Sequence, residues 1–82
     1  MTYRAELSER VLAQLGDFPA KAFDALIAVM SVVVEYPDDP LRTFPTSDPH
    51  VRRAEFGAVG LVTYVIDDGG RTVTLTDVTW SG

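Results

Sequence analysis

The stretch from Gly60 to Val78 places the strongest constraint on how this chain can fold. It begins with the apolar run Gly60–Ile66, continues through the sequence Asp-Asp-Gly-Gly, and returns along Arg71–Trp80. Asp and Gly tolerate the positive φ angles that tight hairpins require. Both faces of the first run are largely apolar, as expected of a strand inside a sheet. The stretch therefore predicts an antiparallel hairpin whose first strand is central.

A short strand and two helices are predicted ahead of this hairpin. Apolar and charged residues alternate over Tyr3–Leu7, which indicates a strand. Ser8 is a suitable N-cap for a first helix of about two turns, which Gly16 would end in a left-handed C-cap. Asp17 and Pro19 then suit the start of a second helix.

The second predicted helix carries a wide apolar stripe. Its members recur at the i, i+3, i+4 spacing of a helix that faces a core, and the helix continues to Tyr36, just before Pro37. The stripe consists of Ala22, Phe23, Leu26, Ile27, Met30, Val33 and Val34. The β-branched run Val32–Val34 would also suit a strand, but the stripe continues through it in phase. We therefore expect a core helix.

A proline-rich segment separates the helices from the remaining strands. Four prolines occur from Pro37 to His50, which predicts a surface loop anchored by Leu41 and Phe44. Val51–Phe56 then has the alternation of a strand.

Together these elements predict an α+β fold in the order β-α-α-β-β-β, with two helices packed on a small antiparallel-rich sheet. A chain of this size buries only ~60–65% of the surface that its unfolded form exposes. One domain spanning residues 1–82 is therefore expected. No cysteine is present to form a disulfide, a thiolate nucleophile or a cysteine zinc site, so stability must come from packing.

Charge and hydropathy exclude several classes of partner. Twelve acidic residues against seven basic ones give a formal charge of −5. Such a surface repels a phosphate backbone unless its arginines gather on one face, so nucleic acid is a disfavoured partner. The N-terminus has no basic leader followed by an apolar stretch, and the longest apolar run, Leu26–Val34, is too short to span a bilayer. We expect a cytoplasmic protein with no membrane partner.

The order of elements and the stretch GLVTYVIDDGGRTVTLTDV, residues 60–78, resemble the RelE/ParE toxin superfamily. The resemblance covers nearly the whole chain and implies the toxin of a type II toxin–antitoxin pair. It also implies that RNA-cleaving members line one sheet face with basic residues, which stabilise charge on the reacting phosphate without a metal or cofactor.

Three positions would carry those basic residues, and this sequence fills one of them. Arg52 or Arg53 meets the first requirement, whereas Gly60 occupies the second position, just before the central strand. The third position is occupied by Thr79, Trp80 and Ser81. The resemblance thus implies a degenerate catalytic set, and we expect a toxin-like module that acts by binding a protein target. Its neutralising partner would be an antitoxin-like helical segment that folds on binding.

Two other functions fit the same sequence. One is a metal-independent, ribosome-dependent mRNA endoribonuclease, with Arg52, Arg53 and Glu55 as its candidate catalytic residues. The other is a non-catalytic scaffold or regulatory oligomerisation domain. It would form a homodimer through the exposed edge of Tyr3–Leu7.

Trp80 and Arg53 are the candidate partner-binding residues. Trp80 near the C-terminus is either an exposed anchor or a ring folded back over the end of the sheet. Arg52 and Arg53 are adjacent and therefore point to opposite faces of a strand. Glu55 lies on the same face as Arg53 and could pair with it.

The remaining polar residues favour turns over metal chemistry. His50 is the only histidine, so no second imidazole is available for a metal cluster, and we expect a loop residue. Asp38 and Asp39 form one acidic pair, and Asp67 and Asp68 form another, both in turn contexts that favour local hydrogen bonding. No metal or cofactor site is predicted.

Overall fold

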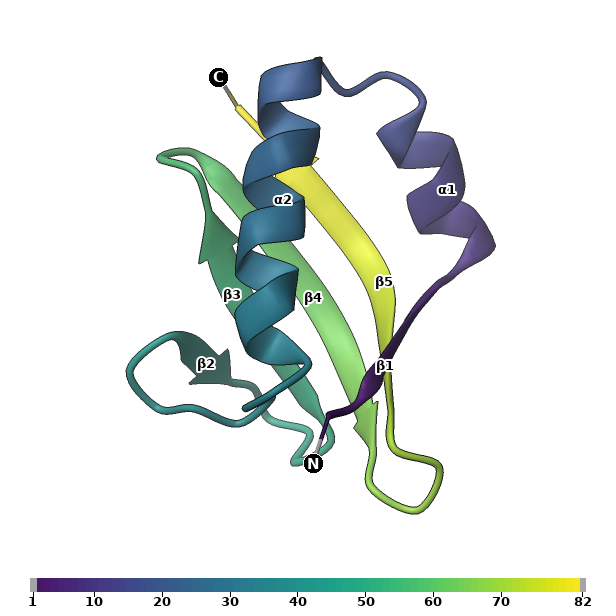
Figure 1. Ribbon diagram of the computed structural model, residues 1–82, viewed down its shortest axis with the longest axis vertical. Coiled ribbons are helices and arrows are strands. Elements are labelled where there is room, and N and C mark those ends of the chain that lie inside the picture. Colours follow the sequence, from purple (N-terminus) through teal and green to yellow (C-terminus); the bar gives the residue numbers. More distant parts are fainter. Residues whose placement is uncertain (1, 82) are drawn as a thin grey trace.

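The computed structural model describes residues 2–81, with both helices lying over one face of a five-stranded sheet (Figure 1). The strands are ordered β1-β5-β4-β3-β2; β1 runs parallel to β5, and the other neighbours are antiparallel. The elements are β1 (Arg4–Leu7), α1 (Glu9–Leu15), α2 (Ala20–Val33), β2 (Thr43–Pro45), β3 (Val51–Phe56), β4 (Gly60–Asp67) and β5 (Thr72–Trp80). The predicted α+β class and the central position of β4 are confirmed.

The start of α1 matches the sequence prediction, but the connection to α2 does not. The Ser8 hydroxyl accepts a hydrogen bond from the Val11 amide at 3.2 Å and caps α1. Gly16 has a right-handed φ of −60°, so the predicted left-handed C-cap is wrong. Asp17 does not cap α2, because its amide still bonds to the last turn of α1. The N-cap of α2 is Pro19, which makes no side-chain capping bond.

The core lies between the helices and the inner face of the sheet. The second helix contributes Ala22, Leu26, Met30 and Val33, and the sheet contributes Ala54, Phe56, Val62, Tyr64, Ile66, Val73, Leu75 and Val78. The predicted stripe is too wide, since Phe23 and Ile27 are 43% and 55% exposed. Helix α2 ends at Val33 and a turn follows over Val34 and Glu35, so the predicted end at Tyr36 is wrong. None of the helices within residues 2–81 has the length and hydropathy needed to cross a membrane.

The proline-rich segment contains a strand that the sequence did not predict. The short edge strand β2 pairs with β3, and Pro45 is tolerated at its end because the outer edge needs no amide donor. Leu41 is 92% exposed and Phe44 47% exposed, so the prediction that they anchor the segment is wrong. A polar contact holds the segment instead: the buried Tyr64 hydroxyl donates to the Pro37 carbonyl at 2.7 Å.

A β-bulge in β5 lets the alternation of the last strand change phase. Thr63 pairs with Asp77 and Tyr64 with Leu75, so Thr76 is the extra residue. Leu75 and Val78 are consequently both buried, although three positions separate them.

Asp77, next to the bulge, connects β5 to α1. Its carboxylate accepts a hydrogen bond from Gln14 Nε2 at 2.9 Å and forms an ion pair with Arg10, whose Nε lies 3.1 Å away. The Val78 amide donates to Gln14 Oε1 at 3.0 Å.

The hairpin between β4 and β5 forms as predicted, but its strained residue is a different one. The Asp67 carboxylate accepts a hydrogen bond from the Gly70 amide at 3.2 Å. The positive φ that we expected within the Asp-Asp-Gly-Gly turn occurs instead at the next residue, Arg71, with φ of 55°. The Arg71 guanidinium lies over the Tyr3 ring, 6.0 Å from its centroid.

Tyr64→Phe should destabilise the fold by ~1–3 kcal/mol, because it removes the donor and leaves the Pro37 carbonyl without its partner. Urea unfolding followed by circular dichroism measures the change. Tyr36→Phe is the matched control, since Tyr36 is 64% exposed. Equal midpoints for the two variants would show that the buried hydroxyl contributes nothing.

Arg71→Gly should be more stable than Arg71→Ala by ~1 kcal/mol, because a left-handed conformation is strained for a residue with a Cβ atom. Both variants lose the contact with Tyr3, so their difference isolates the backbone. Thermal unfolding of the two proteins side by side measures it. An alanine variant as stable as the glycine variant would show that the turn is unstrained at this position.

Candidate functional site

The face of the sheet that the helices leave uncovered carries few charges. Arg53 is opposite Thr63 and Glu55 is opposite Leu61, and both charged side chains are exposed. Arg53 is the one cation that β3, β4 and β5 place on this open face. The ion pair that the sequence allowed between Arg53 and Glu55 is not among the two formed within residues 2–81.

Arg52 lies on the opposite, helix-covered face and is engaged in the structure. Its Nε donates to Thr43 Oγ1 at 2.8 Å, and its terminal nitrogen lies 3.4 Å from the Thr43 carbonyl oxygen. These bonds tie β2 to β3. The structure therefore places the two adjacent arginines on different faces, and Arg53 is the one on the open face.

Packing explains the glycine at the second of the three expected cationic positions. A Cβ atom built on Gly60 would lie 2.6 Å from the Phe56 ring and from the Phe56 carbonyl oxygen. Any larger residue at this position would displace Phe56, whose side chain is almost fully buried. Thr79 and Trp80 alternate outward and inward at the third position, and neither is cationic.

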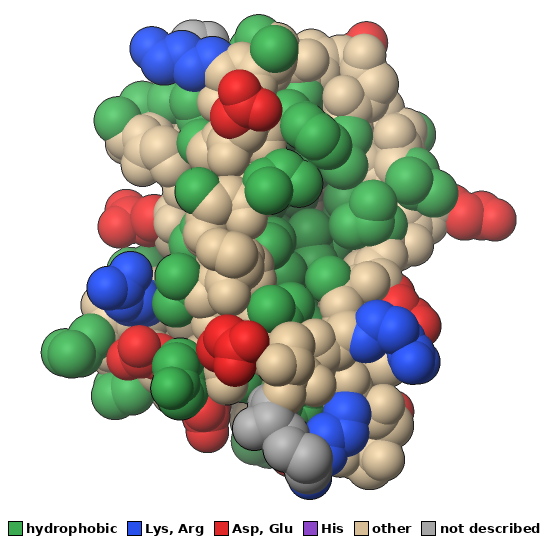
Figure 2. Space-filling view, in the orientation of Figure 1, with side chains coloured by type: hydrophobic (Ala, Val, Ile, Leu, Met, Phe, Trp, Pro, Cys, Tyr) green, Lys and Arg blue, Asp and Glu red, His purple; other side chains and the backbone are tan. Residues whose placement is uncertain are grey.

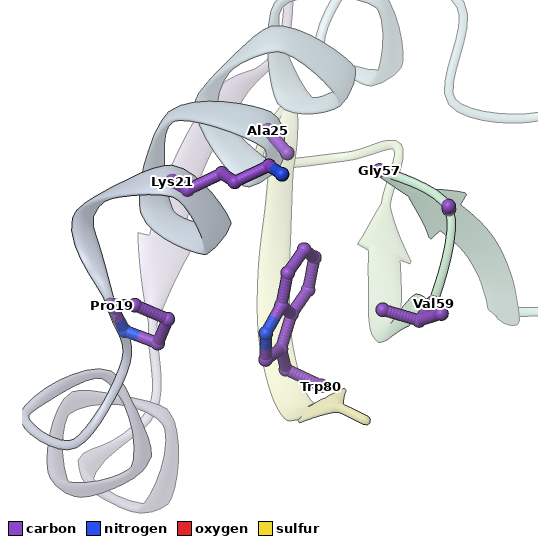
Figure 3. Close-up of a pocket in the computed structure, with 7 residues that line it drawn as sticks. Pro19, Lys21, Ala25, Gly57, Val59 and Trp80 are labelled. Carbon is purple, nitrogen blue, oxygen red and sulfur yellow. The ribbon is translucent and has the colours of Figure 1, made fainter. Parts of the chain in front are cut away.

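Trp80 folds back onto the helix side of the sheet. Its ring stacks on Phe56 with centroids 5.8 Å apart, and Phe56 in turn stacks on Phe18 at 6.3 Å. The other side of the indole lines an open cavity of about 350 Å³, which we call the Trp80 pocket (Figure 3). It is lined by Pro19, Lys21, Ala25, Gly57, Ala58, Val59 and Trp80. Trp80 therefore packs against the core on one side and offers an accessible apolar surface on the other.

A second apolar hollow runs between the two helices and is visible as a band of hydrophobic side chains (Figure 2). Its volume is about 240 Å³, and we call it the helix groove. Residues from β1, α1, α2 and β5 line it: Ala5, Leu7, Leu15, Phe23, Leu26, Ile27, Met30 and Leu75. Phe23 and Ile27, which the sequence assigned to the core, instead form its exposed wall.

A third hollow of about 210 Å³ is polar and contains His50, Asp38 and Asp68. The Tyr3 hydroxyl donates to Asp68 there, and this bond, with a smaller contribution from burial, raises the pKa of Tyr3. His50 is exposed, and its backbone amide donates to Asp48, as expected of a loop residue. Burial also raises the pKa of Tyr64, against the opposing effect of nearby Thr43 and Arg52.

One member of each acidic pair has a local hydrogen-bonding role. Asp39 Oδ1 accepts the Leu41 amide at 2.9 Å, and Asp67 closes the hairpin turn. Among residues 2–81, no three His, Asp or Glu side chains are close enough together to hold a metal ion.

Sequence reasoning singled out Trp80 and Arg53 but missed two features. It did not identify Lys21, the only lysine in the chain, which lies at the rim of the Trp80 pocket. It also missed the helix groove. The available signal was the width of the apolar stripe, which is greater than one helix can bury against the sheet.

Solved structures provide the comparisons for this chain, since no protein-family model and no curated protein sequence matches it. A double mutant of the Escherichia coli toxin RelE, in complex with an antitoxin RelB peptide, is 17% identical. That match covers 100% of this chain and 86% of RelE, with a TM-score of 0.85. The RelBE toxin–antitoxin complex of Mycobacterium tuberculosis is 18% identical over 99% of this chain and 100% of the other, with a TM-score of 0.83.

An archaeal RelE–RelB complex from Pyrococcus horikoshii is 15% identical, covers 100% of this chain and 98% of its own, and has a TM-score of 0.70. At identities this low, the structural matches establish the architecture alone. The resemblance seen in the sequence is confirmed at the level of the fold: the chain has the fold of the RelE toxins.

Proposed function

We propose that this chain is the toxin-like member of a RelBE-type toxin–antitoxin pair and acts in the cytoplasm by binding a protein target, without the usual RNA cleavage. The likeness to RelE toxins over the whole chain supports the first part. The three solved relatives described above are complexes of a RelE toxin with a RelB antitoxin or its peptide, which supports a protein partner for this chain.

The observation that carries the second part is the isolation of Arg53. Cleavage of RNA without a metal depends on several preorganised donors around the reacting phosphate, and one such donor is worth ~3–4 kcal/mol in other enzymes. On the open face β3, β4 and β5 offer one arginine and Arg4 of β1 is paired with Glu6, while Arg52 is bonded to Thr43 and Gly60 has no room for a side chain. The formal charge of −5 further weakens attraction to a phosphate backbone.

The helix groove is the surface that best suits a neutralising partner. Its walls are apolar side chains from both helices, and its floor comes from β1 and β5. An amphipathic helix places apolar residues at i, i+3 and i+4 along one face, which suits a groove with apolar walls. Burying Phe23 and Ile27 beneath such a helix would remove two of the larger exposed apolar side chains from water.

One observation favours the alternative of an mRNA endoribonuclease. Arg53 is exposed and forms no ion pair or side-chain hydrogen bond within residues 2–81, so its charge is not neutralised by the fold. A single free arginine still binds a phosphate, although it supplies only part of the stabilisation that cleavage needs.

Controlled expression in a bacterial host should slow growth without producing new 5′ ends in cellular mRNA during the first minutes after induction. Arg53→Ala should leave that RNA pattern unchanged, because the proposed action does not run through phosphate chemistry. Arg42→Ala is the matched control, since Arg42 is an exposed arginine in the proline-rich segment.

The outcomes separate the three functions. New 5′ ends that disappear in Arg53→Ala but persist in Arg42→Ala would establish the endoribonuclease and overturn the proposal. Unimpaired growth at a confirmed expression level would favour the non-catalytic scaffold. Slowed growth with an unchanged RNA pattern in all three proteins would support action on a protein target.

A further inference from the structure

The Trp80 pocket combines an apolar wall with a single charge. Pro19, Ala25, Val59 and the indole of Trp80 surround the cavity, and Lys21 supplies the only charged side chain that lines it. Figure 3 shows the Lys21 side chain extending from α2 over the pocket, while the Trp80 ring lies between α2 and the β3–β4 turn. Lys21 is exposed and forms no ion pair or side-chain hydrogen bond with residues 2–81. Its charge is therefore available to a partner.

The pocket is preformed because the Trp80 ring is held from two sides. One face stacks on Phe56, and a Cβ atom at Gly57 would lie 2.9 Å from the ring, so only glycine lets the turn approach it this closely. The positive φ of Gly57, 61°, is a second reason for glycine at this position. A cavity with fixed walls costs little ordering on binding.

We propose that the Trp80 pocket receives one large apolar side chain of a protein partner, and that an Asp or Glu next to that side chain in the partner pairs with Lys21. This inference rests on the proposed function, which requires a protein partner, and it adds the chemistry of the contact. Interfaces concentrate their binding energy where an apolar anchor fills a pocket, so Trp80 would be the centre of such a contact.

The lining favours a protein side chain over a free small molecule. Small-molecule sites place several convergent polar groups inside an apolar cavity to fix the orientation of the ligand. Here the interior is apolar, and the one charged group lies at the rim. Such a cavity can hold an anchor whose orientation is set by the rest of a larger partner.

The local charge is opposite to the net charge of the chain. A formal charge of −5 favours a basic partner at long range, but the rim of this pocket is cationic. The acidic neighbours of Lys21 along the chain, Asp17 and Asp24, do not line the pocket or pair with Lys21. An acidic residue flanking the anchor is thus recognised locally, which gives specificity within an otherwise acidic surface.

A displayed library of random 12-residue peptides lacking Trp, selected against the intact chain, tests this inference. Selected peptides should share a large apolar residue adjacent to Asp or Glu. Trp80 is the only tryptophan of the chain, so its fluorescence reports directly on occupation of the pocket by each synthesised peptide. The library is the probe, and no identified antitoxin is needed.

Two variants with matched controls locate the binding. Val59→Asp places a charge in the pocket wall and should weaken binding by at least about tenfold, whereas Leu41→Asp, another replacement of an apolar side chain by Asp but outside the pocket, should have no effect. Lys21→Glu should weaken binding about fivefold and, in a repeated selection, should change the preferred flanking residue from acidic to basic. Arg42→Glu makes the same change in net charge away from the pocket and should leave the preference acidic.

Peptides that bind Val59→Asp and Lys21→Glu as tightly as the unmodified chain would overturn the inference, as would a selection that enriches no acidic flank. Lys21 is exposed, so its variant keeps the test decisive even if Val59→Asp fails to fold. Growth arrest in the host without peptide binding at the pocket would leave the proposed function standing and remove this inference. Binding at the pocket without growth arrest would support this inference and count against the proposed function.

Discussion

The packing of the Phe56 side chain fixes the position of Trp80 and the size of the residue that can stand at position 60. Its ring is almost fully buried between Phe18 and Trp80, with centroid separations of 6.3 and 5.8 Å. The same ring lies so close to Gly60 that a Cβ atom there would approach it to 2.6 Å. One aromatic residue therefore holds Trp80 on the inner face and excludes a cation from the start of β4. The apolar pocket and the glycine at position 60 share this physical cause.

The alternation of β3 separates the two arginines that sequence reasoning could not tell apart. Arg52 shares the helix-covered face of β3 with Ala54 and Phe56, and its guanidinium bonds to Thr43 on that side. Residue 53 shares a face with Glu55 and remains exposed. Two adjacent arginines count equally in a tally of charge, but only one contributes to the potential above the open face.

Sequence patterns predicted the elements whose signals are local and repeated. The alternation in β3, the Ser8 cap and the apolar run of β4 depend on neighbouring residues, and each was confirmed. Local predictions failed at Gly16 and Asp17, and other errors occurred where distant contacts decide. Leu41 and Phe44 are apolar yet exposed, because Tyr64 holds the segment through a backbone carbonyl that carries no sequence signal. Strand β2 depends on its pairing with β3, and the width of the helical stripe depends on where α1 packs.

The site was harder to predict than the fold for a related reason. Trp80 stood out because a large aromatic residue near a chain end is unusual, but its orientation depends on Phe56 and Gly57, which are more than twenty residues earlier. Lys21 carried no signal beyond being the only lysine, and its relevance appears once the turn after β3 is brought against the start of α2. Placing a cation at position 60 would require moving Phe56, and Trp80 would then lose the ring against which it stacks. A larger residue at position 60 and the Trp80 pocket are therefore competing uses of the same packing, and this chain has the packing that forms the pocket.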